Sequence, residues 1–333
     1  MVRSVSSPPA PGTRTRTGPI GREVSGVIRG ENPAGTVLLL DASSLLYRAF
    51  FAVPQSVTDR EGRPVNAAHG YLDMTARLIG SRHPDETVHV HDHDWRPAQR
   101  VSAYSGYKSH RTEEPEALAR QFELLWEVLE AFGFLQAEAP DWEAEDAIGA
   151  LCAGLRESER AEIVTGDRDL IQLVRDPHVR VLFTVTGVSE LRILDEAEVQ
   201  ARYGVPASRY ADFAILRGDP SDGLPGVRGV GEKTARALVQ AYPDLQALVA
   251  DATAQRRTGP PLQRSPALRA AIRDAADYLT AMREVVPIRL DVEVRTWGGT
   301  RCDARLDELA EHHGLQSPVR RLRQALDPGD RGR

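Results

Sequence analysis

The chain has 333 residues, of which 41% are hydrophobic, and its formal net charge at pH 7 is −6. A chain of this length buries one or two substantial cores. Cys152 and Cys302 are its only cysteines, which excludes a disulfide framework, and no apolar run approaches the roughly 20 residues that span a bilayer. The acidic balance argues against a general nucleic-acid coat protein. We therefore expect a globular protein of the cytoplasm with no membrane partner.

Residues 1–34 are rich in Pro, Ser, Thr, Gly and Arg and show no hydrophobic periodicity. Such a composition cannot contribute much to a core, so we predict a disordered basic tail. Prolines at positions 8, 9, 11 and 19 interrupt any amphipathic helix, which disfavours a transit peptide.

The first half of the chain alternates short apolar runs with amphipathic stretches. Strands are predicted at 36–41, 87–92, 161–166 and 179–184, with helices at 42–52, 67–79 and 116–132 and a further helix beginning at Leu170. This order predicts an α/β fold with a mostly parallel sheet that ends near residue 195. Asp41, Asp92 and Asp167 follow strands, and open sheets of this class bind ligands outside the carboxyl ends of their strands. A single such Asp is also typical of a solvated turn.

Three acids open the helix predicted after residue 142, namely Glu143, Glu145 and Asp146. Asp141 is the expected N-cap, and capping explains one or two acids in a first turn but not all three. Like charges about 4 Å apart repel by about 4 kcal/mol at an effective dielectric of 20, so the cluster needs cations. Mg²⁺ prefers carboxylate oxygens and is the simplest candidate.

A basic segment interleaved with aromatic residues covers positions 100–111 and includes Arg100, Tyr107, Lys108 and Arg111. Such a mixture suits a phosphate backbone and a stacked base. A solvated loop with packed tyrosines explains the same residues equally well.

The second half begins with a compact turn at 218–226 that carries Asp219 and Asp222. Gly226, Gly229 and Gly231 then precede a helix predicted at 232–239. Glycines before a helix N-terminus expose backbone N–H groups to a phosphate, and the following Lys233 and Thr234 suit the same ligand. We expect a helix-hairpin-helix grip on the DNA backbone, then helices at 268–282 and 306–312, a short strand at 290–294 and fraying from 328.

These motifs together resemble the 5′-nuclease family, which includes the N-terminal exonuclease domain of bacterial DNA polymerase I, phage 5′ nucleases and flap endonucleases. The segments that carry the resemblance lie in the family's order between residues 36 and 318: VLLLD at 37–41, YR at 47–48, YKSHR at 107–111, EAED at 143–146, TGDRD at 165–169 and GDPSDGLPGVRGVGEKTA at 218–235.

The resemblance implies a PIN-like, Rossmann-like nuclease domain at 35–195, a helix-three-turn-helix domain at 196–318 and a frayed tail at 319–333. It also implies two Mg²⁺ ions, for which Mn²⁺ substitutes, and a K⁺ ion at the helix-hairpin-helix turn. The carboxylates that match the family's metal ligands are Asp41, Asp92, Glu143, Glu145, Asp146, Asp167, Asp169, Asp219 and Asp222. Lys108 and Arg111 match the basic residues that steer the scissile phosphate. The expected DNA contacts are Arg48, Arg100, Tyr107, Gly226, Gly229, Gly231, Lys233 and Thr234.

Three positions depart from the family pattern. Glu145 stands where Asp is usual, Gly223 replaces the usual Asn, and the segment between Asp92 and Arg100 is one residue longer, which makes Asp94 a rival of Asp92.

The expected activity is 5′→3′ exonuclease action on double-stranded DNA with 5′-flap cleavage, by two-metal hydrolysis, in replication or repair. We expect a free-standing monomer that works beside a separate DNA polymerase. Two alternatives remain open: a non-catalytic DNA-binding relative whose metal site has decayed, and a zinc hydrolase built on His89, His91 and His93.

Overall fold

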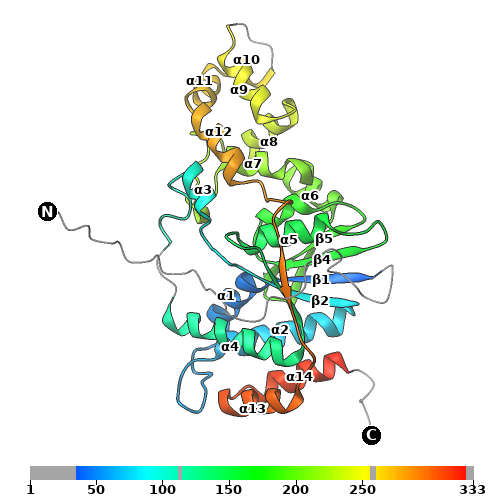
Figure 1. Ribbon diagram of the computed structural model, residues 1–333. Coiled ribbons are helices and arrows are strands. Elements are labelled where there is room, and N and C mark those ends of the chain that lie inside the picture. Colours follow the sequence, from blue (N-terminus) through cyan, green and yellow to red (C-terminus); the bar gives the residue numbers. More distant parts are fainter. Residues whose placement is uncertain (1–34, 112–114, 256–259, 328–333) are drawn as a thin grey trace, which may run out of the picture.

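The computed structural model of the protein describes residues 35–111, 115–255 and 260–327, so the tail expected at 1–34 and the fraying expected from 328 lie outside the described residues. Within these ranges the chain forms an α/β domain around a seven-stranded sheet and a smaller helical domain beside it (Figure 1). The predicted fold class, a mostly parallel sheet followed by a helical domain, is confirmed.

Five parallel strands form the centre of the sheet: β1 (Thr36–Asp41), β2 (Glu86–His91), β3 (Leu135–Glu138), β4 (Arg160–Thr165) and β5 (Val179–Thr186). The full order is β6-β5-β4-β1-β2-β3-β7, with β6 (Glu190–Leu194) and β7 (Arg295–Trp297) antiparallel at the two edges. The chain moves from β1 to β2 on one side and later places β4 on the other. The carboxyl ends of β1 and β4 therefore border the switch point at which open sheets bind ligands.

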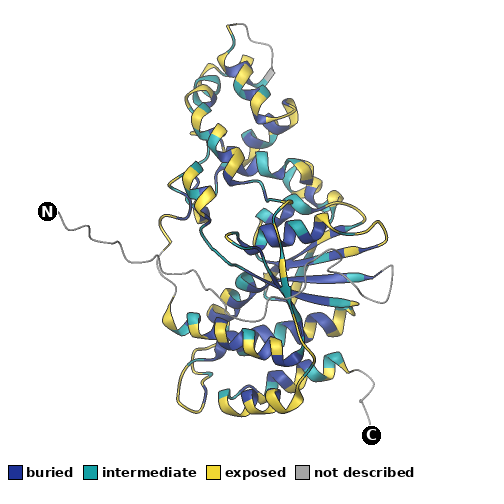
Figure 2. Ribbon diagram, viewed as in Figure 1, coloured by how far each residue is buried: buried dark blue, intermediate teal, exposed yellow. Residues whose placement is uncertain are grey.

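One face of the sheet is covered by α1 (Ala42–Ala52), α2 (Asn66–Arg82) and α4 (Glu116–Phe132). Leu38 and Leu40 of β1 point into this core, while Val37 and Leu39 point to the opposite one. Alternate residues of one strand face opposite sides, so an unbroken apolar run such as that of β1 is what a strand covered on both faces requires. Figure 2 shows the central strands largely buried between the two helical layers, whereas the edge strand β7 is not buried.

The other face is covered by α5 (Ala144–Ala153) and the short 3-10 helix η1 (Asp169–Leu173). The same buried cluster continues into the second domain, where Phe213, Leu238 and Leu279 belong to it. The elements of that domain are α6 (Glu196–Tyr203), η2 (Ala207–Arg209), α7 (Tyr210–Arg217), η3 (Pro220–Asp222), α8 (Glu232–Ala241), α9 (Leu245–Thr253), α10 (Pro260–Arg264), α11 (Pro266–Asp274) and α12 (Ala276–Val285). The two parts thus share a core instead of meeting across a polar interface. A small helix, α3 (Ala98–Ala103), connects them near the site.

The chain then returns to the first domain. After α12 it runs back to β7, which pairs with β3, and ends in α13 (Asp303–His313) and α14 (Gln316–Leu326), which lie on α4 and α2. Figure 1 shows these two helices at the opposite end of the molecule from α8 and α9.

This return corrects three expectations. The sheet does not end near residue 195, because β7 closes its edge; the strand expected at 290–294 begins only at Arg295. Residues 319–326 are helical and not frayed, because Val319 and Leu322 are buried in the core on the α2 side.

Strand β3 was not predicted from the sequence, since its four residues alternate too briefly to give a periodic signal.

Local differences are smaller. The helix expected at 268–282 is two helices that meet at Ala275, and the helix expected from Leu170 is only the short 3-10 turn of η1. The other predicted helices and strands of the first domain agree with the structure to within three residues.

Candidate metal and DNA site

Asp41 occupies the carboxyl end of β1 and also begins α1. Its Oδ1 accepts a hydrogen bond from the Ser44 backbone N (3.1 Å), so it is the N-cap of that helix. Its Oδ2 accepts from the Thr165 hydroxyl (2.6 Å), whose oxygen in turn accepts from the Asp167 backbone N (2.8 Å). Thr165 therefore joins the acids that follow β1 and β4. No role was assigned to Thr165 from the sequence, although its place directly before Gly-Asp was the available signal.

Asp92 follows β2 and accepts a hydrogen bond from the Ala144 backbone N (2.7 Å) in the first turn of α5. The positive end of the helix dipole favours a carboxylate there. Asp94 instead accepts from the Arg96 backbone N (2.9 Å) within its own turn. The structure thus brings Asp92, and not Asp94, against the acids of α5.

The three acids of α5 lie at its N-terminus. Glu143 is the N-cap and forms a reciprocal capping box with Asp146, whereas Asp141 has a φ of 65° and lies outside the helix. The expectation that Asp141 caps this helix is therefore wrong, because a residue two positions later makes both reciprocal bonds. One ligand oxygen from each of Glu143, Glu145 and Asp146 lies within 4.8 Å of the others, a spacing that could hold a metal ion.

Basic side chains already contact these acids. Lys108 and Arg100 form ion pairs with Glu143, and the Tyr107 hydroxyl donates to the same carboxylate (2.6 Å). Arg100 and Tyr107 are buried, so the expectation that they contact DNA is not supported: their polar atoms face the protein interior. Nothing in the sequence indicated this burial, because the basic segment that carries both residues has no hydrophobic periodicity.

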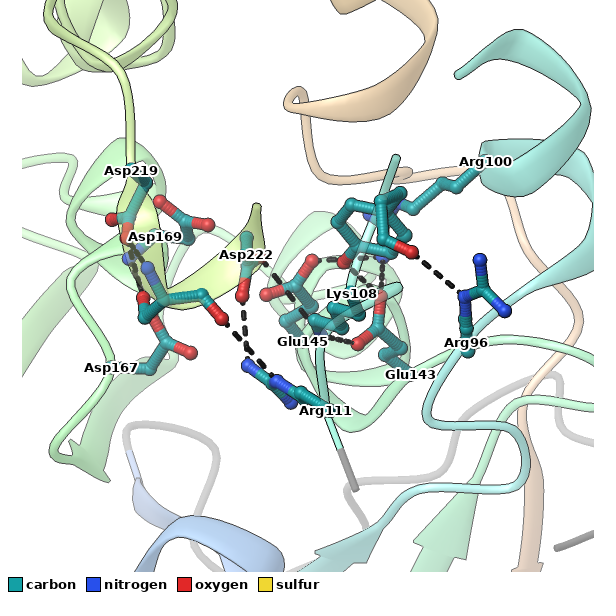
Figure 3. Close-up of polar contacts among 12 residues, drawn as sticks. Arg96, Arg100, Lys108, Arg111, Glu143, Glu145, Asp167, Asp169, Asp219 and Asp222 are labelled. Carbon is teal, nitrogen blue, oxygen red and sulfur yellow. Dashed lines mark hydrogen bonds and ion pairs between the residues drawn. The ribbon is translucent and has the colours of Figure 1, made fainter. Parts of the chain in front are cut away.

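A second set of acids faces the first across the basic segment. It comprises Asp167 and Asp169 after β4 and Asp219 and Asp222 from the turn around η3 (Figure 3). The Arg111 guanidinium contacts Asp222 (2.8 Å) from between the two sets.

Backbone contacts join the basic segment to this turn. The Lys108 N donates to the Asp222 carbonyl (2.9 Å). Gly223 has a φ of +73°, and a Cβ placed there would lie 2.6 Å from the Gly106 carbonyl oxygen. The close approach of the two segments explains why glycine stands at position 223 in this chain.

Burial and mutual repulsion shift the protonation of these carboxyls. Burial and the nearby charges of Asp92 and Asp167 raise the pKa of Asp41 to about 7, although the hydrogen bond from Thr165 acts in the opposite direction. Burial and Asp167 also raise the pKa of Asp169 well above its usual range. The pKa of Glu143 is lowered despite its burial, because Lys108 and Arg100 are adjacent. Crowded oxygen ligands with raised pKa values fit a divalent cation, which would stabilise their charged forms.

The glycine turn of the second domain lies at the start of α8. Gly226 and Gly229 have φ values of 68° and 76°, and Gly231 is the N-cap of the helix. No protein atom lies within 4 Å of a Cβ built at Gly229 or Gly231, and Lys233 is exposed beside them while Thr234 is half-buried. This part of the turn is open to a ligand, as predicted for a phosphate contact.

Two other predictions concern Arg48 and the histidines. Arg48 is half-buried and donates to the Val185 carbonyl oxygen (3.2 Å), close to the loop that carries Asp167. His89 bonds the Tyr71 hydroxyl (2.7 Å) and His91 bonds Trp126 (2.9 Å), both inside the fold. These partners account for both histidines as core residues and leave the zinc alternative without a site among the described residues.

Family models match nearly the whole described chain. Residues 36–204 match the 5′-3′ exonuclease N-terminal resolvase-like domain, and residues 205–304 match the 5′-3′ exonuclease C-terminal SAM fold. The protein therefore belongs to the 5′-3′ exonuclease family and is an enzyme of that family.

Two relatives cover most of the chain. A "5′-3′ exonuclease" of Streptomyces coelicolor is 41% identical over 87% of this chain and 99% of its own length. A protein of the same name from Mycobacterium tuberculosis is 40% identical over 87% of this chain and 98% of its own. A DNA polymerase I of Mycobacterium bovis is 40% identical over 66% of this chain but only 24% of its own length.

Solved structures share the fold at low identity. The T5 5′-exonuclease with bound zinc ions has a TM-score of 0.57 and 17% identity, covering 88% of this chain and 98% of that one. The catalytic core of Rad2 in complex with DNA substrate has a TM-score of 0.53 and 15% identity, covering 90% and 93%. No helix in the described part of this chain combines the length and apolar character needed to cross a membrane.

Proposed function

We propose that this protein is a 5′→3′ exonuclease that acts on double-stranded DNA and also cleaves 5′ flaps. The observation that carries the proposal is the meeting of two acid sets around Lys108 and Arg111 at the carboxyl edge of the sheet. Duplex would be gripped by the glycine turn before α8, which is part of the same buried core as that edge. The names of the relatives and the DNA in the Rad2 complex support the same substrate class.

The side chains proposed to hold two Mg²⁺ ions are carboxylates drawn from both sets, together with Asp41 and Asp92. When bound, the ions lower the pKa of water and stabilise negative charge on a leaving oxygen. Mn²⁺ is proposed to substitute for Mg²⁺. A K⁺ ion is proposed at the glycine turn, where carbonyl oxygens of residues 226–231 would be its ligands.

Lys108 and Arg111 are proposed to neutralise charge on the reacting phosphate. In this structure, Lys108 forms an ion pair with Glu143, and Arg111 forms one with Asp222. Both lie in one segment that the Arg96 guanidinium fixes by donating to the Tyr107 and Ser105 carbonyls (2.7 and 3.0 Å). Prior orientation of cationic donors toward developing charge is the main source of rate in such hydrolysis. Arg111 offers a planar fork that matches phosphate oxygens.

Lys233, Thr234 and the glycine N–H groups are proposed to bind phosphates of the duplex without reading bases. Arg48 remains a proposed DNA contact beside the loop of Asp167. We propose a monomer that acts in replication or repair beside a separate DNA polymerase, in the cytoplasm. Cys152 and Cys302 are both free thiols, which agrees with a reducing compartment.

The test is a digest of 5′-labelled flap, nicked and blunt duplexes with Mg²⁺, with Mn²⁺ and with EDTA. We expect cleavage of nicked and flap substrates with either ion and none with EDTA, while circular dichroism shows the fold retained in EDTA. Single-stranded DNA of the same sequence is the control for the duplex preference. Binding without cleavage of any substrate would establish the non-catalytic alternative.

A further inference from the structure

Arg100 is the largest side chain that is fully buried among the described residues. Its guanidinium carbon lies 5.8 Å from the ring centroid of Tyr107 and 5.9 Å from that of Trp142, at the N-terminus of α5. A buried guanidinium retains its charge, so its surroundings must supply compensating negative groups.

All three acids of α5 supply that charge. One guanidinium nitrogen, Nη1, contacts Glu143 and lies 2.9 Å from Glu145, and the other, Nη2, lies 2.8 Å from Asp146. The acid group whose spacing could suit a metal ion therefore already surrounds a cation of the protein itself. A divalent ion held by all three acids would lie against that guanidinium.

Asp146 is the most completely used of the three. Its Oδ1 accepts from Arg100 and from the Arg289 backbone N (2.9 Å), and its Oδ2 faces the Glu143 backbone N (3.4 Å) in the capping box. Arg289 can approach because Gly149 lacks a side chain: a Cβ there would lie 2.7 Å from the Arg289 carbonyl oxygen. The segment that returns from the second domain thus helps to fix Asp146.

Exposure separates the acids in the same way. The Asp146 side chain is 0% exposed, the Glu143 side chain 5% and the Glu145 side chain 12%. Hydrogen bonds use both acceptor sites of Asp146 Oδ1 and one of Oδ2, and the side chain has no exposed surface, so Asp146 is the least available of the three acids to an incoming ion. Glu145 is the α5 acid that reaches furthest toward solvent.

We propose that Arg100 is a positioning residue that serves as the permanent counter-ion of α5, withdraws Asp146 from the metal-binding carboxylates and orients Glu145 toward the metals. The proposal rests on the proposed metal-dependent function. It changes the predicted ligand set, because Asp146 becomes a support of Arg100 instead of a ligand.

The first experiment counts bound Mn²⁺ by electron paramagnetic resonance and titration calorimetry on the full chain without DNA. We expect Asp146→Asn to keep the stoichiometry of the parent and its affinity within about threefold, because Asn retains an oxygen for the Arg289 N–H. Glu145→Gln is expected to lose at least about tenfold in affinity or one ion, with Asp169→Asn as the reference for a lost ligand. A loss for Asp146→Asn equal to that of Asp169→Asn would overturn the proposal.

The second experiment compares thermal melting with and without Mn²⁺. Arg100→Met should lower the melting temperature in EDTA, and Mn²⁺ should restore more of it than it adds to the parent, because three uncompensated acids then attract the ion. The melting temperature of Arg100→Lys in EDTA should lie between those of Arg100→Met and the parent. Arg82→Met is the matched control, since Arg82 pairs with Glu162 at the other end of β4 and its loss should be independent of Mn²⁺. Equal losses with and without Mn²⁺ for Arg100→Met would reduce Arg100 to a structural role and overturn the proposal.

These readouts do not depend on cleavage. If the parent binds Mn²⁺ with the expected ranking of variants but cleaves no DNA, the proposed function fails and the assignment of Arg100 stands. If the parent binds no Mn²⁺, the α5 acids cannot be separated into metal ligands and supports of Arg100, and the assignment fails. If Arg100→Met does not fold, the Asp146→Asn titration decides.

Discussion

The two acid sets of the site solve the same electrostatic problem differently. The acids of α5 enclose Arg100 and contact Lys108, so their negative charge is compensated within the protein. The acids after β4 and in the turn around η3 lie beside one another. Cations reach only the acids of the turn: Arg111, whose side chain is 39% exposed, and Lys108 lie 2.8 and 4.0 Å from Asp222, and Arg217 lies 3.8 Å from Asp219. Among the described residues, no ion pair compensates Asp167 or Asp169. Charge compensated by buried cations supports the fold, whereas charge left uncompensated favours binding of external cations. The comparison therefore separates the acids that stabilise the site from those proposed to bind the metal ions.

Removing a carboxylate should have opposite effects on stability in the two sets. Glu143→Gln leaves Lys108 and Arg100 without a full partner in a buried setting, so we expect a loss of about 3–5 kcal/mol in the free energy of unfolding. Urea denaturation of the metal-free protein measures it. A change under about 1 kcal/mol would mean that the ion pairs of α5 rearrange freely, and the contrast between the sets would disappear.

Asp167→Asn and Asp169→Asn test the other set. Each relieves like-charge repulsion, so the metal-free protein should be as stable as the parent or more stable. Turnover should nonetheless fall by roughly 100-fold or more, about 2.7 kcal/mol of barrier, with little change in duplex affinity. Single-turnover cleavage and filter binding separate the two quantities. Turnover within about tenfold of the parent would remove these residues from the metal site, and unfolding of both variants would assign them a structural role.

The raised pKa of Asp41, which lies near Asp167, gives the stability of the metal-free protein a pH dependence. Asp41 titrates near 4 when unfolded and at about 7 when folded, so the folded state binds the extra proton between these values. The stability that this proton contributes is complete below about pH 4 and is lost as the pH rises through about 7. Melting of the EDTA-treated protein from pH 5.5 to 7.5 should therefore show decreasing stability, and Asp41→Asn should flatten that decrease. An unchanged slope in Asp41→Asn would assign the effect to other groups.

The glycine turn offers the smallest effect and tests whether DNA binding is separate from both acid sets. Lys233 is exposed and its proposed contact is to a phosphate, so Lys233→Ala should weaken duplex binding about three- to tenfold at low salt, equally for all sequences. Saturated turnover should be unchanged. Arg228→Ala is the control, because Arg228 is another exposed basic residue of the same turn. Its effect shows how much of the loss in duplex affinity comes from removing a positive charge anywhere in the turn. Losses that depend on base sequence would contradict a backbone contact.

The sequence predicted well those features that depend on nearby residues. Apolar runs ending in an acid located β1 and β2, and the acids that follow them meet at one edge as expected. Features that depend on residues far apart in the chain were not predicted, because no local sequence pattern encodes them. Arg100 is buried only because α5 and the aromatic rings of distant segments surround it. β7 is a strand only because β3 offers it an edge.

The site shows the same limit. All the acids lie at or near the predicted edge, but the sequence could not tell Asp146, whose oxygens are occupied, from Glu145, one position earlier. Polar partners of the acids, such as the Thr165 hydroxyl and the Ser44 backbone N that both donate to Asp41, carry no periodic signal, and their roles follow only from geometry.

The return of the chain to β7, α13 and α14 makes the helical domain an insertion with two attachments instead of an appended module. These two attachments, together with the shared buried core, limit how far the glycine turn can move relative to the acids. The same layout sets the smallest piece worth expressing. A chain cut at residue 304, where the match to the second family model ends, would keep the pairing of β7 with β3 but lose α14 and nearly all of α13, and so uncover the apolar surface of α2.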